Sequence, residues 1–263
     1  MTLKKSNHIR VVSRNRVQNS TKICHILGNG PSLKDSISAV KVSAERHEGI
    51  VMAANTYYLC DQHKFPTPHY YVFGDPVLQT DDYIANLENI FLEVTTRFPG
   101  VNILSSRLIA NHISRKLNKY DRELIYRILY ADFSDFLVKD QYSFALEQSL
   151  EPYQNVLIMM MQFAIFLGHK KLCLHGFDLS MSHNYQEKHE DYFHMQSPYA
   201  WKTKPAKKTA HEIISSKNLI LEQFRILIRS AFKFGVKIEA PQSKILSHIM
   251  KEEQMRPLNN LIF

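Results

Sequence analysis

The chain has 263 residues, 44% of them hydrophobic, which is enough to bury the core of one large domain. It carries a net charge of +8 but no run of about 18 apolar residues, and its N-terminus lacks the apolar segment of a secretory signal, so neither a membrane span nor export is expected. The three cysteines are far apart and form no Cys-x-x-Cys pair, which argues against a disulfide framework and a structural zinc site and favours a cytoplasmic protein.

The positive charge is concentrated at the N-terminus, where the first 33 residues contain several lysines and arginines and no acidic residue. We interpret residues 1–20 as a basic, flexible arm and residues 21–263 as one domain. An arm of this kind can contact anionic lipid headgroups, so peripheral association with the inner membrane is one expectation. Nucleic acid is not expected as a partner, because no helix-turn-helix, RNA-recognition or zinc-finger signature accompanies the charge.

Short apolar runs bounded by turn residues predict buried strands in the first half of the chain. They lie at 23–27, 49–54, 69–73 and 101–104. A helix is expected from Pro31 onward, since proline suits the first helical turn. Residues 108–138 have helical spacing and are not assigned to the sheet.

The second half continues the alternation of helices and strands. An apolar helix at 153–167 precedes a strand at 171–175, and a polar loop at about 180–208 separates this strand from a long amphipathic helix that contains residues 213–227. A last strand is predicted at 236–239. This order predicts a single Rossmann-like α/β domain, with a mostly parallel sheet, helices on both faces and a lid-like loop.

Polar residues follow several predicted strands. In parallel α/β sheets, ligands bind at these carboxyl ends of the strands. The polar residues are Asn29, Asn55, Asp75 and Asp178. Four strand ends that agree in this way are stronger support for a binding site than any one of them.

The loop Gly28-Asn29-Gly30-Pro31-Ser32 joins the first strand to the first helix. Glycines permit close approach of a phosphate, and a helix N-terminus offers free N–H groups and a favourable dipole. The loop is neither a Walker A motif nor a Gly-x-Gly-x-x-Gly dinucleotide motif, because Leu33 occupies the position of the third glycine. A second interpretation stays open: a tight turn in which Ser32 helps to cap the helix.

Several segments resemble the glycosyltransferase family 42 sialyltransferases, bacterial enzymes that use CMP-sialic acid. The opening Gly-Asn-Gly-Pro-Ser-Leu-Lys carries the resemblance most specifically. Further similarity lies, in the same order, in Ala54-Asn55-Thr56-Tyr57-Tyr58, Val72-Phe73-Gly74-Asp75-Pro76 and the stretch from Val156 to Asp178 with its Gly176-Phe177-Asp178 ending. The same opening also occurs in proteins similar to 6-hydroxymethylpterin diphosphokinases.

The resemblance implies roles for individual residues. Asn29, Gly30 and Ser32 would contact the phosphate and ribose of the donor, together with the flanking Gly28 and Pro31. Asn55 would contact the nucleotide, as would Asp75, Gly176 and Asp178 at the other strand ends, and Gln154 and Asn155 would lie near the donor sugar. Asp75 stands where the family has an asparagine, and Ser180 stands at the nearer of two positions where the family has a tyrosine.

The lid-like loop supplies the candidates for catalysis. Inverting glycosyl transfer needs a general base for the acceptor hydroxyl, and histidine suits this role near neutral pH. His211 comes first, because the resemblance places the catalytic histidine at the start of the helix after the lid, and His189 comes second. Tyr185 and Tyr192 are the candidates to assist the leaving phosphate.

These observations predict a metal-independent, inverting glycosyltransferase with a nucleotide-sugar donor, most specifically CMP-sialic acid or a related CMP-nonulosonate. The acceptor would be a glycan or glycolipid of lipopolysaccharide or capsule biosynthesis, and a homo-oligomer is compatible with the sequence. No cofactor or metal is expected, since the spacing of the lid histidines does not match a compact metal site. Two other interpretations remain open: a pterin-type pyrophosphokinase that uses ATP and magnesium, and a non-catalytic nucleotide-binding module.

Overall fold

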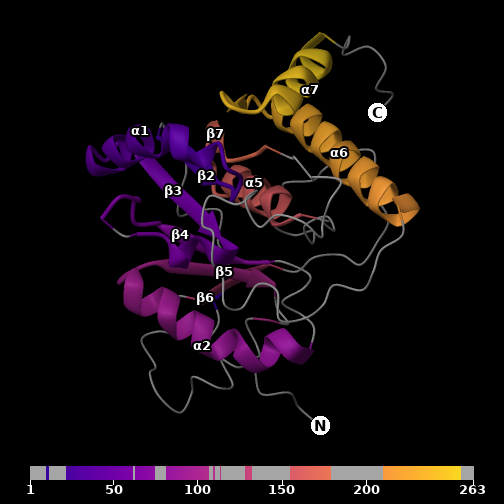
Figure 1. Ribbon diagram of the computed structural model, residues 1–263. Coiled ribbons are helices and arrows are strands. Elements are labelled where there is room, and N and C mark those ends of the chain that lie inside the picture. Colours follow the sequence, from indigo (N-terminus) through magenta and orange to yellow (C-terminus); the bar gives the residue numbers. More distant parts are fainter. Residues whose placement is uncertain are drawn as a thin grey trace.

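One parallel sheet with helices on both faces organises the protein (Figure 1). The computed structural model describes residues 10–11, 22–61, 63–74, 81–106, 109, 113, 128–131, 155–178 and 210–255. Within these residues the eight strands follow the order β1-β6-β5-β4-β3-β2-β7-β8, and every neighbouring pair is parallel. The α/β Rossmann-like architecture predicted from the sequence is therefore confirmed.

The elements alternate along the chain, as parallel pairing requires. The strands are β1 (Arg10–Val11), β2 (Ile23–Leu27), β3 (Gly49–Ala54), β4 (Tyr70–Phe73), β5 (Asn102–Ser106), β6 (Ile128–Ala131), β7 (Lys171–His175) and β8 (Lys237–Glu239). The helices are α1 (Leu33–Glu45), α2 (Asp81–Arg97), α5 (Val156–Phe166), α6 (Ala210–Lys233) and α7 (Lys244–Met255), with a 3₁₀ turn, η2 (Asn55–Leu59), directly after β3.

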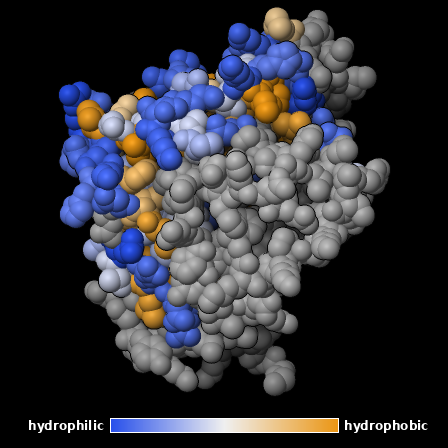
Figure 2. Space-filling model, viewed as in Figure 1, coloured by the Kyte–Doolittle hydropathy of each residue, from blue (hydrophilic) through white to orange (hydrophobic). Residues whose placement is uncertain are grey.

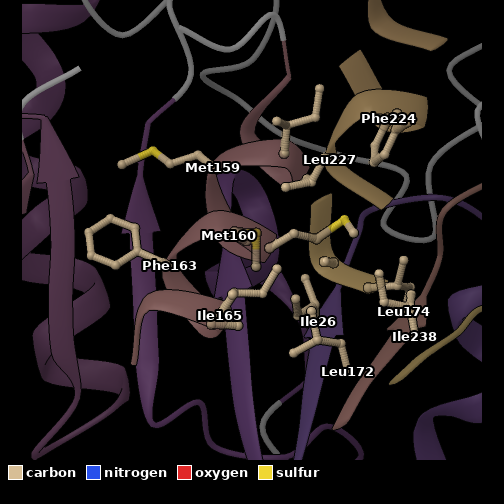
Figure 3. Close-up of a cluster of buried hydrophobic side chains, with 14 of the residues drawn as sticks. Ile26, Met159, Met160, Phe163, Ile165, Leu172, Leu174, Phe224, Leu227 and Ile238 are labelled. Atoms are coloured by element: carbon tan, nitrogen blue, oxygen red, sulfur yellow. The ribbon is translucent and has the colours of Figure 1, made fainter. Parts of the chain in front are cut away.

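Side chains that alternate along each strand divide the interior into two cores. One core lies between the sheet and α1 and α2, and includes Leu27, Val51 and Tyr71. The other lies between the opposite face and α5, α6 and α7, and includes Ile26 and Leu174 (Figure 3). Both faces of the sheet are thus buried, which explains the nearly continuous apolar runs of its central strands.

Helix α5 is apolar on all sides because it is buried on all sides. Ten of its eleven residues are buried, and the helix packs against both the sheet and α6. In Figure 3, Met160 and Ile165 of α5 lie close to Ile26 of β2, while Phe224 and Leu227 of α6 approach from the other side. The amphipathic α6 therefore covers α5 on this face, and its exposed positions include Ser215, Asn218 and Glu222.

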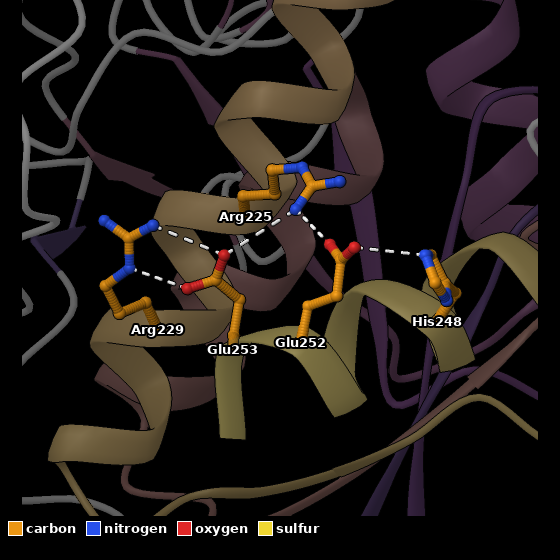
Figure 4. A network of polar contacts seen from close by, with 5 residues as sticks. All are labelled: Arg225, Arg229, His248, Glu252 and Glu253. Atoms are coloured by element: carbon orange, nitrogen blue, oxygen red, sulfur yellow. Dashed lines mark hydrogen bonds and ion pairs between the residues drawn. The ribbon is translucent and has the colours of Figure 1, made fainter. Parts of the chain in front are cut away.

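A network of charged side chains joins α6 to α7 (Figure 4). Glu253 is only 5% exposed, and one of its carboxylate oxygens accepts a hydrogen bond from Arg229 Nε at 2.7 Å. Arg225 contacts both Glu252 and Glu253, and His248 Nε2 lies 3.1 Å from Glu252. The buried carboxylate of Glu253 is thereby matched by two guanidinium groups, as a buried charge requires.

The surface of the described residues carries mostly hydrophilic side chains on the face seen in Figure 2. Its large exposed hydrophobic residues are scattered over different elements: Val42, Leu92, Phe234, Ile245 and Met255. Among the described helices, none combines the length and the apolar character that crossing a bilayer requires.

Most elements match the sequence predictions, with one correction. The strands predicted at 23–27, 49–54 and 171–175 have these bounds, and those at 69–73, 101–104 and 236–239 differ only at their ends. The segment 108–138 was expected to be helical, but it contains β6, which pairs with β5 inside the sheet. Two residues of the basic segment form β1 at the edge of the sheet, and β1, α2 and α7 were not predicted.

Candidate functional site

The strand order reverses between β2 and β7. From β2 the chain proceeds through β3, β4, β5 and β6 in one direction and then returns to place β7 on the other side of β2. In open parallel sheets such a reversal opens a crevice at the carboxyl ends of the two strands, because the connections leave in opposite directions. The loops that follow β2 and β7 are therefore the expected position of a ligand, and both contain predicted site residues.

Glycines hold these two loops in direct backbone contact. Gly28 N–H donates to the carbonyl of His175 at 2.7 Å, and Gly30 N–H donates to the carbonyl of Gly176 at 3.0 Å. A Cβ on Gly28 would lie 2.5 Å from the oxygen of Gly176, and a Cβ on Gly176 would lie 2.6 Å from the oxygen of Gly28. Any side chain at either position would separate the loops, so the glycines are required for this contact whatever else they do.

Asp178 caps the first helix across the crevice. Its Oδ2 accepts a hydrogen bond from Ser32 N–H at 3.1 Å, and a Cβ on Gly30 would collide with the same oxygen. The Ser32 side chain makes no capping hydrogen bond to α1, so the cap comes from Asp178 and not from Ser32. The carboxylate also places a negative charge at the positive end of the helix dipole.

Three buried polar atoms in this region have no hydrogen-bond partner among the described residues: Asn29 Oδ1, Ser32 Oγ and Asn55 Oδ1. Asn29 and Ser32 follow β2, and Asn55 follows the neighbouring strand β3. Asn29 Nδ2 lies 3.4 Å from the hydroxyl oxygen of Thr56, which links the two strand ends. Buried polar atoms are normally paired, and unpaired ones at a strand-end crevice are typical of a ligand site.

A buried tyrosine fixes the backbone at Asn55. This residue has a φ of +56°, a left-handed conformation that asparagine adopts more readily than most residues. The hydroxyl of Tyr71 donates a hydrogen bond to the Asn55 carbonyl and accepts one from the Tyr58 backbone N–H at 3.2 Å. Burial raises the pKa of Tyr71 well above its usual range, so the hydroxyl remains protonated and able to donate.

The remaining predicted residues divide into two groups. Asn155 lies directly before α5, where its side-chain oxygen caps the helix by accepting from Leu157 N–H at 2.9 Å. The backbone of His211 lies in the first turn of α6, at the helix start where it was expected. Five residues lie outside the described part of the chain: Asp75, Gln154, Tyr185, His189 and Tyr192.

The sequence analysis missed Thr56 and Tyr71, which order the two asparagines, and a buried group beneath the loops. In this group His25 Nδ1 lies 3.1 Å from His175 Nε2, and His25 Nε2 lies 3.0 Å from Ser43 Oγ. Desolvation by burial lowers the pKa of His25, and it lowers that of His175 to about 4 with a smaller contribution from His25, so both rings are neutral at pH 7. In hindsight, two histidines on neighbouring apolar strands were the only signal for this pair.

Comparisons with known proteins identify the fold. No family model matches the chain, and no curated protein matches it in sequence. Among solved structures, the chain is similar to the sialyltransferase CstII from Campylobacter jejuni, which was determined in complex with the substrate analogue CMP-3FNeuAc. The TM-score is 0.50 at 18% sequence identity, over 86% of this chain and 84% of that one.

A second solved structure with similarity is the MAf glycosyltransferase from Magnetospirillum magneticum. Its TM-score is 0.48 at 15% identity, and the match covers 90% of this chain but 38% of that one. The likeness to CstII over most of both chains shows a fold that a glycosyltransferase also uses.

Proposed function

We propose that the protein is a metal-independent, inverting glycosyltransferase that uses a nucleotide-sugar donor. The observation that carries the proposal is the set of three buried, unpartnered polar atoms of Asn29, Ser32 and Asn55 at the crevice between β2, β3 and β7. The likeness in fold to a sialyltransferase supports the choice of reaction class. The donor we favour is CMP-sialic acid or a related CMP-nonulosonate.

The chemistry of the three atoms suits a nucleoside monophosphate. Amide oxygens accept hydrogen bonds, so Asn29 Oδ1 and Asn55 Oδ1 would receive them from ribose hydroxyls or from the amino group of a base. A serine hydroxyl can also donate, so Ser32 Oγ would donate to a phosphate oxygen. In this arrangement the asparagines bind the nucleoside and the serine binds the phosphate.

The carboxylate of Asp178 favours a donor with one phosphate group. Because Asp178 accepts from Ser32 N–H, it occupies the end of α1 where additional phosphate charge would otherwise be stabilised. A diphosphate or triphosphate would bring the charge of two or three phosphate groups toward this carboxylate, whereas a CMP-linked sugar brings that of one. The same argument makes the pyrophosphokinase interpretation less favourable, since ATP carries three phosphate groups.

The catalytic step would use residues at the lid and the start of α6. A histidine base, His211 first and His189 second, would remove the proton of the acceptor hydroxyl as its oxygen attacks the anomeric carbon. The bond from that carbon to the phosphate oxygen breaks, CMP leaves, and Tyr185 and Tyr192 would donate hydrogen bonds to the departing phosphate. The acceptor would be a glycan or glycolipid of lipopolysaccharide or capsule biosynthesis, brought close by contact of the basic arm with an anionic membrane surface.

Thermal unfolding with a panel of nucleotides tests the proposal. The panel is CMP, CDP, UDP, GDP and ATP, each with and without magnesium. A ligand present at about 100 times its dissociation constant stabilises the folded state by about 2.7 kcal/mol, so we expect CMP to raise the Tm without metal. A shift only with ATP and magnesium would overturn the proposal in favour of the pyrophosphokinase. Stabilisation by CMP without transfer from CMP-sialic acid to any glycan acceptor would leave a binding module.

A further inference from the structure

Two histidines and a cysteine converge on the side of β2 and β7 that faces α1. His25 belongs to β2 and Cys173 and His175 to β7, and the register of the two strands sets His25 opposite Cys173. One ligand atom from each residue lies within 4.8 Å of those of the other two. His25 and His175 are 7% and 4% exposed, and Cys173 is partly buried. We propose that these three residues form a binding site for a cation that prefers nitrogen and sulfur ligands, Zn²⁺ in the first place.

The separation of the two rings suits a shared ion. In a tetrahedral site with Zn–N bonds of about 2.0–2.1 Å, two nitrogen ligands lie about 3.3 Å apart. Nδ1 of His25 and Nε2 of His175 are 3.1 Å apart and face one another. Two neutral imidazoles and a thiolate form a ligand set that zinc and other late first-row cations favour over calcium or magnesium. A water would complete the fourth position.

Ser43 of α1 holds the first ring in the orientation that the site needs. Its hydroxyl oxygen lies 3.0 Å from Nε2 of His25. When the second ring nitrogen is fixed by a hydrogen bond, the tautomer and the direction of the other nitrogen are fixed as well, which is the usual support of a metal-bound histidine. In this arrangement His25 Nε2–H donates to Ser43, and the lone pair of Nδ1 faces His175.

His175 has a second ring nitrogen that takes no part in the contact. A neutral imidazole has one N–H, so Nδ1 needs a partner of its own whether Nε2 meets His25 or an ion. Nδ1 is buried without a partner among the described residues, so it does not distinguish the two arrangements. Beside the group, β8 places Glu239 next to Cys173 in register, and this carboxylate forms an ion pair with Lys237 at 2.6 Å. Burial and Glu239 together raise the pKa of Cys173 to about 11, so binding the ion would release the thiol proton.

The ion would connect strands on the two sides of the strand-order reversal. Strand β7, which carries Cys173 and His175, ends directly before Gly176, and His25 lies three residues before Gly28. The ion would therefore stabilise the base of the two contacting loops. It would take no part in glycosyl transfer. The inference therefore stands apart from the proposed function, and each can fail without the other.

Cobalt substitution tests the site in the full chain. Co²⁺ added to the reduced protein under argon should bind with one equivalent that shows a thiolate-to-cobalt charge-transfer band and the strong visible bands of four-coordinate cobalt. Zn²⁺ should displace this equivalent and raise the Tm. We expect Cys173→Ala to abolish the charge-transfer band and to weaken Zn²⁺ binding by more than about 100-fold. Loss of a group that only hydrogen-bonds to a metal ligand weakens binding by about 10–100-fold, so the larger effect identifies Cys173 as a ligand.

Cys24→Ala is the matched control, because Cys24 is buried on the same strand as His25 but belongs to the core on the opposite face. It should keep both the band and the zinc-dependent rise in Tm. The absence of a thiolate band in the wild type would overturn the proposal even if a variant fails to fold. Cobalt binding without a thiolate band, or a band that survives Cys173→Ala, would overturn the proposal and assign the ion to other histidines, and so would the absence of binding.

Discussion

Two regions of this protein differ in how their buried polar groups are satisfied, since the groups are paired in one region and unpaired in the other. Between α6 and α7, the Glu253 carboxylate is buried, and Arg225 and Arg229 compensate its charge (Figure 4). After β2 and β3, side-chain oxygens of Asn29, Ser32 and Asn55 are buried without partners among the described residues. An unpaired buried group costs about 1–3 kcal/mol, so the first arrangement serves stability and the second is maintained at the expense of stability. Four predictions test this division, from the largest expected effect to the smallest.

Arg229→Met should have the largest effect, because it leaves the buried Glu253 carboxylate with Arg225 at 3.8 Å as its remaining cation in the network. Removing one partner of a buried ion pair costs about 3–5 kcal/mol, which we expect as a loss in the free energy of unfolding measured with urea. The control is Lys237→Met, whose ion pair with Glu239 is exposed and should contribute less than about 1 kcal/mol. Equal losses in the two variants would remove the distinction between buried and exposed pairs.

His169 provides a buried polar group at the opposite end of the strands, where no ligand is expected. The residue is fully buried directly before β7, and its ring interacts with the backbone of Lys22. Desolvation lowers its pKa from 6.5 to about 4. Above pH 6.5 the ring is neutral in both the folded and the unfolded protein, so it does not change the free energy of unfolding with pH. As the pH falls below 6.5, the unfolded chain takes up the proton first. Stability should therefore fall by about 3 kcal/mol between pH 6.5 and pH 4 and lose nothing more from this group below that.

Urea unfolding at a series of pH values measures this loss. In His169→Gln the fall between pH 6.5 and pH 4 should be smaller by about 3 kcal/mol than in the wild type. The remaining fall should include His175, whose pKa is also lowered to about 4. If the two pH profiles are parallel, burial of His169 does not oppose its protonation.

Tyr71→Phe should affect both stability and binding. The change leaves the Asn55 carbonyl and the Tyr58 N–H without their shared partner inside the protein, so we expect a loss of about 2 kcal/mol in the free energy of unfolding. Because the hydroxyl also holds Asn55 in its left-handed conformation, CMP affinity should fall as well, measured by calorimetry at a temperature where the variant is folded. Unchanged affinity would separate Tyr71 from the site.

Ser32→Ala should give the smallest change in stability and a clear change in binding. The hydroxyl oxygen is buried without a partner among the described residues, so its removal should not lower the free energy of unfolding and should raise it by about 1 kcal/mol. A lost hydrogen bond to a charged phosphate should weaken CMP binding by at least about tenfold. Ser38→Ala, at an exposed position on the same helix, is the control and should change neither quantity. A stability loss without a loss of affinity would show that Ser32 is structural.

The sequence was sufficient for the strands whose apolar runs end at turn residues. Residues 23–27 and 171–175 are examples, since burial on both faces makes such strands apolar throughout. The segment containing β6 was misassigned because aromatic and charged residues give it helical spacing, and only its place beside β5 selects the strand. Helix α7 was missed although Leu246, Ile249 and Met250 recur at helical spacing and are buried in the core.

The candidate site was predictable where it depends on strand ends and unpredictable where it depends on distant partners. The ends of parallel strands share one edge, so the proximity of Asn29 and Asn55 follows from the fold class. The hydrogen bond from Ser32 N–H to Asp178 joins residues 146 positions apart, and nothing local in the sequence indicates it. The pairing of His25 with Cys173 and His175 likewise depends on strand register, which the apolar pattern alone does not fix.

The central position of β2 has a consequence for synthesis of the chain on the ribosome. This strand pairs with β3 on one side and β7 on the other, and β7 is translated about 150 residues later. At about 5–20 residues per second, the nascent protein carries an open edge on β2 for roughly 7–30 s before its partner strand is made. Such an edge is a template for pairing with other chains, so expression at lower temperature, or with chaperones that bind exposed strands, should raise the yield of folded protein.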